Sequence, residues 1–232
     1  MATPTLTPTA FQILSTIDAC VEERHLLKHP FYKAWTAGTL SLEALRDYAA
    51  QYYHHVAAFP TYLSAVHSQT DDQATRRHIL NNLMEEEAGS PNHPELWMAF
   101  AERLGLTREQ VETAEVWPET RALIQGFRRV CRENGVAAGL SALYAYESQI
   151  PAVSESKIQG LQKFYGFDEP AGYRYFSVHI EADREHSEIE RKLLAACVTP
   201  QNCGPSLHAV EVVLTRLWNL LSAVCSHHAI CN

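Results

Sequence analysis

The stretch from Val136 to Ile150 constrains the fold of this 232-residue chain more than any other. It is rich in small residues and almost entirely apolar, and a helix that is apolar all round must be surrounded by other elements. Its one acidic residue, Glu147, would then be buried, where an unpaired carboxylate is strongly unfavourable. Glu147 therefore requires a cation, a hydrogen-bond donor or a proton.

The remaining sequence predicts helices. No stretch alternates apolar and polar residues over more than four positions, whereas apolar residues recur at helical spacing. At 46% hydrophobic residues, the chain can bury one sizeable core. No repeat or long linker divides it, so we predict a single all-α domain, a bundle of about eight helices. We expect this domain to span residues 10–226, with flexible tails at 1–9 and 227–232.

Breaker and capping residues set the expected helix ends. Asp71 or Asp72 is the predicted N-cap of one helix, which ends at the Gly-Ser-Pro-Asn cluster of residues 89–92. The segment Pro200–Pro205 is expected to separate the last two helices, the final one running from about His208 to Ser226.

Charge and cysteine usage narrow the functional classes. A net charge of −8 argues against nucleic acid or an anionic membrane as the main partner. The sequence shows no apolar run long enough for a membrane span and no secretory signal at its start. Its six cysteines form no CxxC pair, which favours reduced thiols in the cytoplasm.

The segment 173–190 carries the clearest chemical signal. It places His179, Asp183 and His186 at i, i+4 and i+7 of one helix, within roughly 60° of arc. Two imidazoles and a carboxylate on one stripe can hold a divalent metal. The alternative is an ordinary polar surface, although apolar residues flank the stripe. One helix cannot close a metal site, so other segments must supply ligands.

A second set of candidate ligands lies around the break at residues 89–92. Glu86 shares the apolar face of its helix, whereas Glu85 and Glu87 are expected to point elsewhere. His93 follows just after the break. Glutamates near a helix C-terminus are disfavoured by the helix dipole, which suggests that one of them is held by something positive. A solvated glutamate face is the alternative interpretation.

Together with Glu147, these segments offer three carboxylates and three imidazoles. This set suits two adjacent iron or manganese ions with positions left open for O₂, and it exceeds what a single zinc needs. For Glu147 alone, a hydrogen bond to a buried Tyr or Arg remains the alternative. The segment Cys225–Cys231 has a metal-like composition, but its place at the chain end favours a tail.

The six-residue pattern resembles the ligand set of the heme-oxygenase-like dimetal oxidases, and within them the CADD-like proteins. The resemblance covers the chain from His29 to about Leu194. The broader superfamily includes the TenA thiaminases and the PqqC oxidases, which share the helical bundle. The six ligand positions are Glu86, His93, Glu147, His179, Asp183 and His186.

The resemblance implies synthesis of para-aminobenzoate for folate. It implies a dinuclear centre, Fe/Fe or Mn/Fe, that uses O₂ and an external reductant. Tyr32 matches the family tyrosine that is consumed as the source of the ring, and Lys157 matches the lysine proposed to give up its amine. Tyr48, Tyr146 and Tyr175 match further tyrosines near the metals, which can carry oxidising equivalents. A protein that consumes its own residues acts once unless it is repaired.

We also expect a homodimer and a particular division of the ligands. In that division Glu147 bridges the two ions. One ion is bound by Glu86, His93 and His186, and the other by His179 and Asp183.

Three other functions stay open from the sequence. The first is a dimetal oxygenase acting on a small external substrate, which should survive Tyr32→Phe with modest loss. The second is an interaction protein with an incidental metal site. The third is a TenA-like hydrolase working through a cysteine, for which Cys131 and Cys197 lack a recognisable His or Glu partner.

Overall fold

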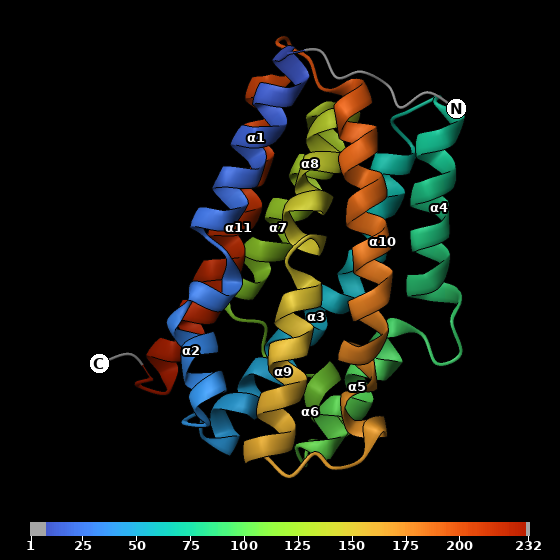
Figure 1. Cartoon of the computed structure of the whole chain (residues 1–232). Coiled ribbons are helices and arrows are strands. Elements are labelled where there is room, and N and C mark those ends of the chain that lie inside the picture. Colours follow the sequence, from blue (N-terminus) through green and yellow to red (C-terminus); the bar gives the residue numbers. More distant parts are fainter. Residues whose placement is uncertain (1–7, 231–232) are drawn as a thin grey trace.

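The computed structural model describes residues 8–230, which fold into one helical bundle without strands, as predicted (Figure 1). This part of the chain forms eleven α-helices, where about eight were expected. The helices are α1 (Pro8–Glu23), α2 (Pro30–Ala37), α3 (Leu42–His67), α4 (Gln73–Ala88), α5 (His93–Arg103), α6 (Arg108–Glu112), α7 (Pro118–Glu133), α8 (Gly135–Glu147), α9 (Ile150–Phe164), α10 (Arg174–Cys197) and α11 (Cys203–His227), with 3₁₀ turns at Leu26–Lys28 and Pro170–Tyr173.

Helix α8 lies in the core of the bundle, as its composition predicts. Every residue from Ala137 to Glu147 is buried, and helices α11, α10, α7 and α3 pack around α8. Its small side chains let these neighbours approach closely. The carboxyl group of Glu147 is consequently held inside the bundle, with only 2% of the residue exposed.

Polar caps fix the ends of α4 and α5. Asp72 is the N-cap of α4, because its carboxylate accepts the backbone N–H of the third following residue at 2.8 Å. Asn92 and Glu95 form a capping box at the start of α5. The connection between the two helices returns the chain to the bundle, where α4 and α5 both pack on α3 and α10. It thereby brings Glu86, near the end of α4, close to His93.

Helix α11 begins earlier than expected. It starts at Cys203 rather than near His208, and Pro205 lies in its first turn. Proline is tolerated there because the first N–H groups of a helix have no intrahelical acceptor. By length and composition α11 also resembles a membrane span. Its apolar face packs against α8 and α7, so it serves here as a core helix.

The two ends of the described chain differ from the expected tail boundaries. Helix α1 already begins at Pro8. Near the other end, the ring of His227 stacks on Trp117 with centroids 4.2 Å apart. The segments 1–7 and 231–232 lie outside the described residues, so the predictions made for them stay predictions.

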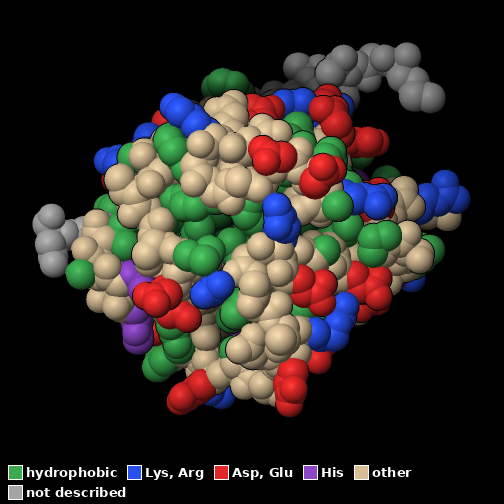
Figure 2. Space-filling view, turned by 90° about the horizontal axis from the view of Figure 1, so that it is seen from below, with side chains coloured by type: hydrophobic (Ala, Val, Ile, Leu, Met, Phe, Trp, Pro, Cys, Tyr) green, Lys and Arg blue, Asp and Glu red, His purple; other side chains and the backbone are tan. Residues whose placement is uncertain are grey.

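Charged side chains are spread over the surface. On the face seen from below, acidic and basic groups are interspersed, and the basic ones do not gather into a patch (Figure 2). Some exposed charged side chains of the protein form ion pairs, as Arg184 does with Glu155 and Glu181. That face therefore offers no continuous positive surface.

Helix α9 packs closely on α2 at Gly160, which gives a test of the packing. A Cβ at this position would lie 2.5 Å from Cδ1 of the fully buried Trp35. We predict that Gly160→Ala lowers the free energy of unfolding by about 1–3 kcal/mol, because overpacking forces the indole or the helix to move. Urea denaturation measures this change. Gly204→Ala is the matched control, since its Cβ would meet nothing within 4 Å; an equal loss in both variants would contradict the close contact.

Candidate metal centre

Helix α10 turns its polar stripe toward the core. His179 and Asp183 are 4% exposed and His186 is 6% exposed. The Nδ1–H of His179 donates a hydrogen bond to the carbonyl oxygen of Tyr175 at 2.6 Å. Since a carbonyl can only accept, Nδ1 carries the proton and Nε2 keeps a free lone pair. A metal-binding histidine needs this arrangement.

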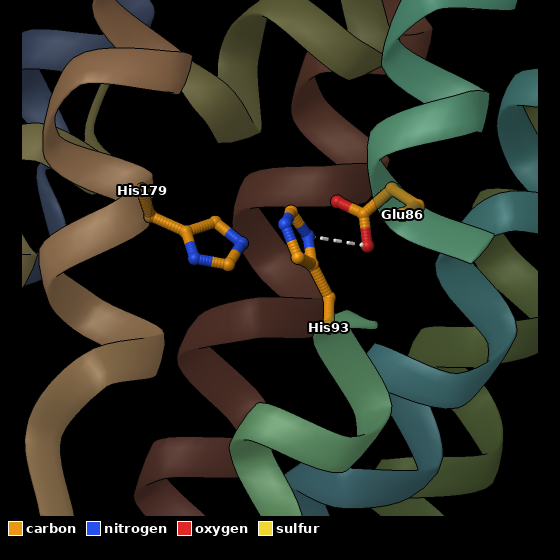
Figure 3. Close-up of side chains that lie close together, drawn as sticks. All are labelled: Glu86, His93 and His179. Carbon is orange, nitrogen blue, oxygen red and sulfur yellow. Dashed lines mark ion pairs between the residues drawn. The ribbon is translucent and has the colours of Figure 1, made fainter. Parts of the chain in front are cut away.

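Glu86 and His93 approach the same region from α4 and α5. Both are buried, and Oε2 of Glu86 lies 2.9 Å from Nδ1 of His93. The rings of His93 and His179 lie 4.4 Å apart between centroids. Three side chains from three helices therefore converge at one point in the core (Figure 3).

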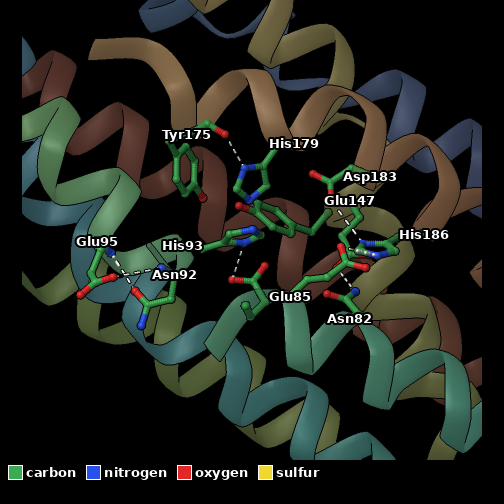
Figure 4. A network of polar contacts seen from close by, with 12 residues as sticks. Asn82, Glu85, Asn92, His93, Glu95, Glu147, Tyr175, His179, Asp183 and His186 are labelled. Atoms are coloured by element: carbon green, nitrogen blue, oxygen red, sulfur yellow. Dashed lines mark hydrogen bonds and ion pairs between the residues drawn. The ribbon is translucent and has the colours of Figure 1, made fainter. Parts of the chain in front are cut away.

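The six side chains of the predicted ligand pattern come together as two groups of three. Within each group, one potential ligand atom from every residue lies within 4.8 Å of the others. Their division differs from the expected one, because α10 passes α5 first and reaches α8 two turns later (Figure 4). The two histidines of α10 thus exchange places. The first group is Glu86, His93 and His179, and the second group is Glu147, Asp183 and His186.

Buried polar atoms without a hydrogen-bond partner in the second group indicate which kind of ligand would fit there. Nδ1 of His186, Oδ2 of Asp183 and Oε2 of Glu147 are buried and lack a hydrogen-bond partner among the described residues. Buried polar atoms nearly always have a partner. Imidazole nitrogen and carboxylate oxygen are ligands that iron and manganese accept. The residues present therefore fit divalent metal ions.

Burial sets the protonation of these groups when no cation is bound. Burial, and then the nearby Glu86 carboxylate, raises the pKa of Asp183 well above its ordinary value. Burial and Asp183 raise the pKa of Glu147 to about 8. Burial and the neighbouring imidazole of α5 hold the pKa of His179 well below its ordinary value. A divalent cation reverses this for the carboxyl groups, since it displaces their protons when it binds.

Two residues that the sequence did not single out support the second group. Asn82 donates a hydrogen bond from Nδ2 to Oε1 of Glu147 at 2.9 Å. Glu85 was expected to point away, yet its Oε2 lies 3.3 Å from Nε2 of His186, although half of its side chain is exposed. Such contacts fix the orientation of ligands. Asn82 could have been found from its place one turn before Glu86.

A small enclosed cavity adjoins both groups. Its volume is about 10 Å³, and Tyr146 and Tyr175 line it together with ligand-type residues of both groups. That volume admits about one water-sized molecule. A larger hollow of about 420 Å³ lies elsewhere, between Pro60, Ser64 and Arg132, but it is open to solvent and contains none of the predicted site residues. The unpartnered polar atoms point to the smaller cavity as the chemical site.

Tyr32, Tyr48 and Lys157 form a second buried cluster. The side-chain amine of Lys157 donates a hydrogen bond to the Tyr48 hydroxyl at 2.6 Å. The hydroxyls of Tyr32 and Tyr48 lie 3.4 Å apart, and the Lys157 nitrogen is 5.5 Å from the centroid of the Tyr32 ring. Lys157 is 4% exposed and has no acidic partner in the described part of the chain, so burial holds its pKa well below its ordinary value. The amine is therefore pushed toward its neutral, nucleophilic form.

Aromatic side chains join this cluster to the metal-binding residues. Tyr52 packs on Tyr48 with ring centroids 5.3 Å apart, and its hydroxyl lies 2.8 Å from the hydroxyl of Tyr146. Trp97 stacks on Tyr52 and contacts Tyr175, whose ring lies 4.1 Å from that of His179. Tyr52 and Trp97 have the helical spacing of ordinary core residues, and such spacing cannot distinguish core residues from site residues.

The cysteines lack the environment of a nucleophile. Cys20, Cys131, Cys197 and Cys203 are free thiols. Burial raises the pKa of Cys131 far above its ordinary value and that of Cys197 to about 11. A reactive cysteine needs a lowered pKa. The structure thus gives no support to hydrolysis through either thiol.

Comparison with known proteins identifies the family. Residues 46–215 match the model of a family described as iron-containing redox enzymes. The chain belongs to this family. It is 44% identical over 210 residues to the 4-aminobenzoate synthase of Chlamydia pneumoniae, covering 90% of this chain and 93% of the relative. It is 43% identical over 218 residues to that of Nitrosomonas europaea, covering 90% and 89%.

Solved structures give the same fold. A TenA homologue from Pseudomonas syringae superposes with a TM-score of 0.80 at 18% identity, over 97% of this chain and 96% of the other. The heme-oxygenase-like bundle and the family resemblance predicted from the sequence are therefore confirmed. The chain is an enzyme of the iron-containing redox family, and its two groups of buried ligand-type residues fit that chemistry.

Protonation of the metal-free site gives a second prediction. Near pH 7 the Glu147 carboxyl is ionised in the unfolded chain but protonated in the folded one, since burial raises its pKa to about 8. Unfolding then releases a proton, so the metal-free protein should lose stability as the pH rises from 7 toward 8. Stabilisation by added Mn(II) should grow over the same interval.

Thermal unfolding at both pH values, with and without Mn(II), measures these trends. Glu147→Gln should flatten the decrease seen without metal. A metal-free protein that becomes more stable toward pH 8 would contradict the assigned protonation.

Proposed function

We propose that the chain makes 4-aminobenzoate, using O₂ at a centre of two divalent metal ions, Fe/Fe or Mn/Fe, together with an external reductant. Relatives of 41–44% identity that carry the name 4-aminobenzoate synthase support the product. The two groups of ligand-type residues support the two ions. When bound, such ions supply the redox chemistry that activates O₂.

The proposed substrate is the protein itself, with Tyr32 as the source of the ring and Lys157 as the source of the nitrogen. The observation that carries this proposal is that the buried Lys157 nitrogen lies 5.5 Å from the centroid of the Tyr32 ring, while burial holds its pKa well below the ordinary value. Tyr32 is 2% exposed. The cavity beside the ligands, about 10 Å³, has the size of a water molecule and not of an aromatic ring, which favours a substrate within the protein.

The product itself defines which bonds must change. In 4-aminobenzoate the carboxyl carbon is attached to the ring, so Cβ of Tyr32 becomes that carbon and the Cα–Cβ bond breaks. The phenol oxygen is replaced by nitrogen: Nζ of Lys157 bonds to the ring and the oxygen leaves as water. Oxidation then breaks the Nζ–Cε bond and leaves Cε as an aldehyde, while residue 32 stays in the chain without its side chain. O₂ is the oxidant in this account.

The surrounding residues have definite tasks in this reaction. The Tyr48 hydroxyl orients the Lys157 amine through its 2.6 Å hydrogen bond. Burial excludes water and lowers the pKa of the amine, which favours its deprotonated form. Tyr146 and Tyr175 line the cavity beside the ligands, and Tyr52 and Trp97 connect them to the Tyr32 cluster. Phenols and indoles are the side chains most easily oxidised, so this aromatic layer suits the transfer of oxidising equivalents to Tyr32.

Product analysis tests the proposal directly. Anaerobic protein is loaded with Fe(II), with or without Mn(II), and is then exposed to O₂ and a reductant. We expect 4-aminobenzoate in the supernatant, with mass lost from the peptides that contain Tyr32 and Lys157. Tyr32→Phe should release none. Tyr62→Phe, a fully buried tyrosine that stacks on Phe127, is the control and should release as much as the native protein. Metal uptake and O₂ consumption with both peptides intact would instead indicate an external substrate.

Replacing the amine separates its chemical role from its structural role. Lys157→Met keeps the length of the side chain among the surrounding rings and removes a buried polar group. We predict thermal stability equal to or above that of the native protein, by up to about 1 kcal/mol, with no 4-aminobenzoate formed. Thermal unfolding and mass spectrometry measure the two effects. Product formation by this variant would exclude Lys157 as the nitrogen source.

A further inference from the structure

Helix α10 carries one more buried carboxylate beyond the six residues of the ligand pattern. Glu190 lies one turn after His186 on the same face and is 1% exposed. Among the described residues, neither of its carboxylate oxygens accepts a hydrogen bond from an N–H or hydroxyl group, and the group within reach is the carboxyl of Glu147. A carboxylate in this situation is strongly unfavourable unless a cation or a proton compensates it.

The charged groups that act on Glu190 are themselves acidic. Its carboxyl group meets that of Glu147, and Asp183 adds a further repulsion. Within residues 8–230, no basic side chain is among the groups that act on this carboxyl. Two carboxyl groups in contact repel each other unless a proton or a cation is shared between them. Glu190 therefore points toward the second group, where the unpartnered atoms of Asp183 and His186 also lie.

The charge balance of the proposed two-ion site favours a fourth carboxylate. The ligand pattern supplies three carboxylates, Glu86, Glu147 and Asp183, together with imidazoles, which bind metal in their neutral form. Two divalent ions carry four positive charges, so these residues alone would leave one positive charge unbalanced in the core. Uncompensated charge is costly in a medium of low dielectric constant. A fourth buried carboxylate makes the centre neutral.

We propose that Glu190 is the fourth carboxylate of the metal centre. It positions Glu147 by contact and balances the charge of the ion held by Glu147, Asp183 and His186. This inference rests on the two-ion centre of the proposed function. It extends the stripe on α10 by one more turn, so that the spacing of 179, 183 and 186 continues to 190.

Mn(II) binding to Glu190→Gln tests the assignment without relying on activity. The exposed Glu188, which pairs with Lys192 at 2.6 Å on the same helix, provides the control Glu188→Gln. Equilibrium dialysis counts bound Mn(II), and electron paramagnetic resonance distinguishes a coupled pair of ions from an isolated one. We expect two coupled ions per chain in the native protein and in Glu188→Gln. In Glu190→Gln the second ion should bind about 10–100-fold more weakly and leave the signal of isolated Mn(II).

Unfolding of the metal-free proteins supplies an independent measurement. Glu190→Gln should unfold at a higher temperature than the native protein without metal, because it removes a buried repulsion. A residue needed only for packing would give the opposite shift. Glu190→Asp keeps the charge at a shorter reach and should recover part of the affinity for the second ion.

The outcomes separate this inference from the proposed function. Two coupled ions bound by Glu190→Gln with native affinity would overturn the role of Glu190 alone. A lower unfolding temperature of metal-free Glu190→Gln would overturn it as well. A native protein that fails to bind two ions would overturn the two-ion centre, and this inference with it.

Discussion

The structure depends on the burial of acidic groups inside an apolar bundle. Glu147 ends a helix that is otherwise almost entirely apolar, and Glu86, Asp183 and Glu190 come to the same region from neighbouring helices. In a core of low dielectric constant such groups repel each other and retain protons. Burying these carboxyl groups together lowers the stability of the fold. Two bound divalent cations would offset their mutual repulsion. The fold therefore has a property expected of a metal-binding protein: the side chains at the site lower the stability of the metal-free protein.

The second buried cluster follows from the same principle. Among the described residues Lys157 has no acidic partner, and aromatic rings surround its amine. Burial lowers the pKa of such an amine and so favours the neutral form, whereas a surface lysine stays charged. The Tyr48 hydroxyl orients it, and Tyr52 lies between this cluster and the cavity beside the metal-binding residues. Because this cluster lies in the core, water is kept from it. The ring of Tyr32 then lies beside the Lys157 amine, as the proposed function requires.

Much of this arrangement could be predicted from the sequence, because burial leaves a pattern in it. The apolar stretch ending at Glu147 required a central helix, and the spacing of His179, Asp183 and His186 required one polar face on α10. What could not be predicted depends on how helices pack. The division of the histidines between the two groups is set by where α10 passes α5 and α8. Glu190, in contrast, continues a readable stripe.

Other residues were missed for different physical reasons. Glu85 lies in a run of glutamates and is half-exposed, so nothing local distinguishes it from a solvated residue until His186 is placed beside it. Tyr52 and Trp97 have the spacing of ordinary core residues. Their role depends on which side chains lie on either side of them, and that is a property of the tertiary structure.

The central claim is that two metal ions lie in the core, one in each group of three residues. Anomalous diffraction from crystals of the Mn(II)-loaded protein tests it most directly. The account predicts two manganese peaks, one among Glu86, His93 and His179 and the other among Glu147, Asp183 and His186. A single peak, or manganese bound only at the surface, would contradict it.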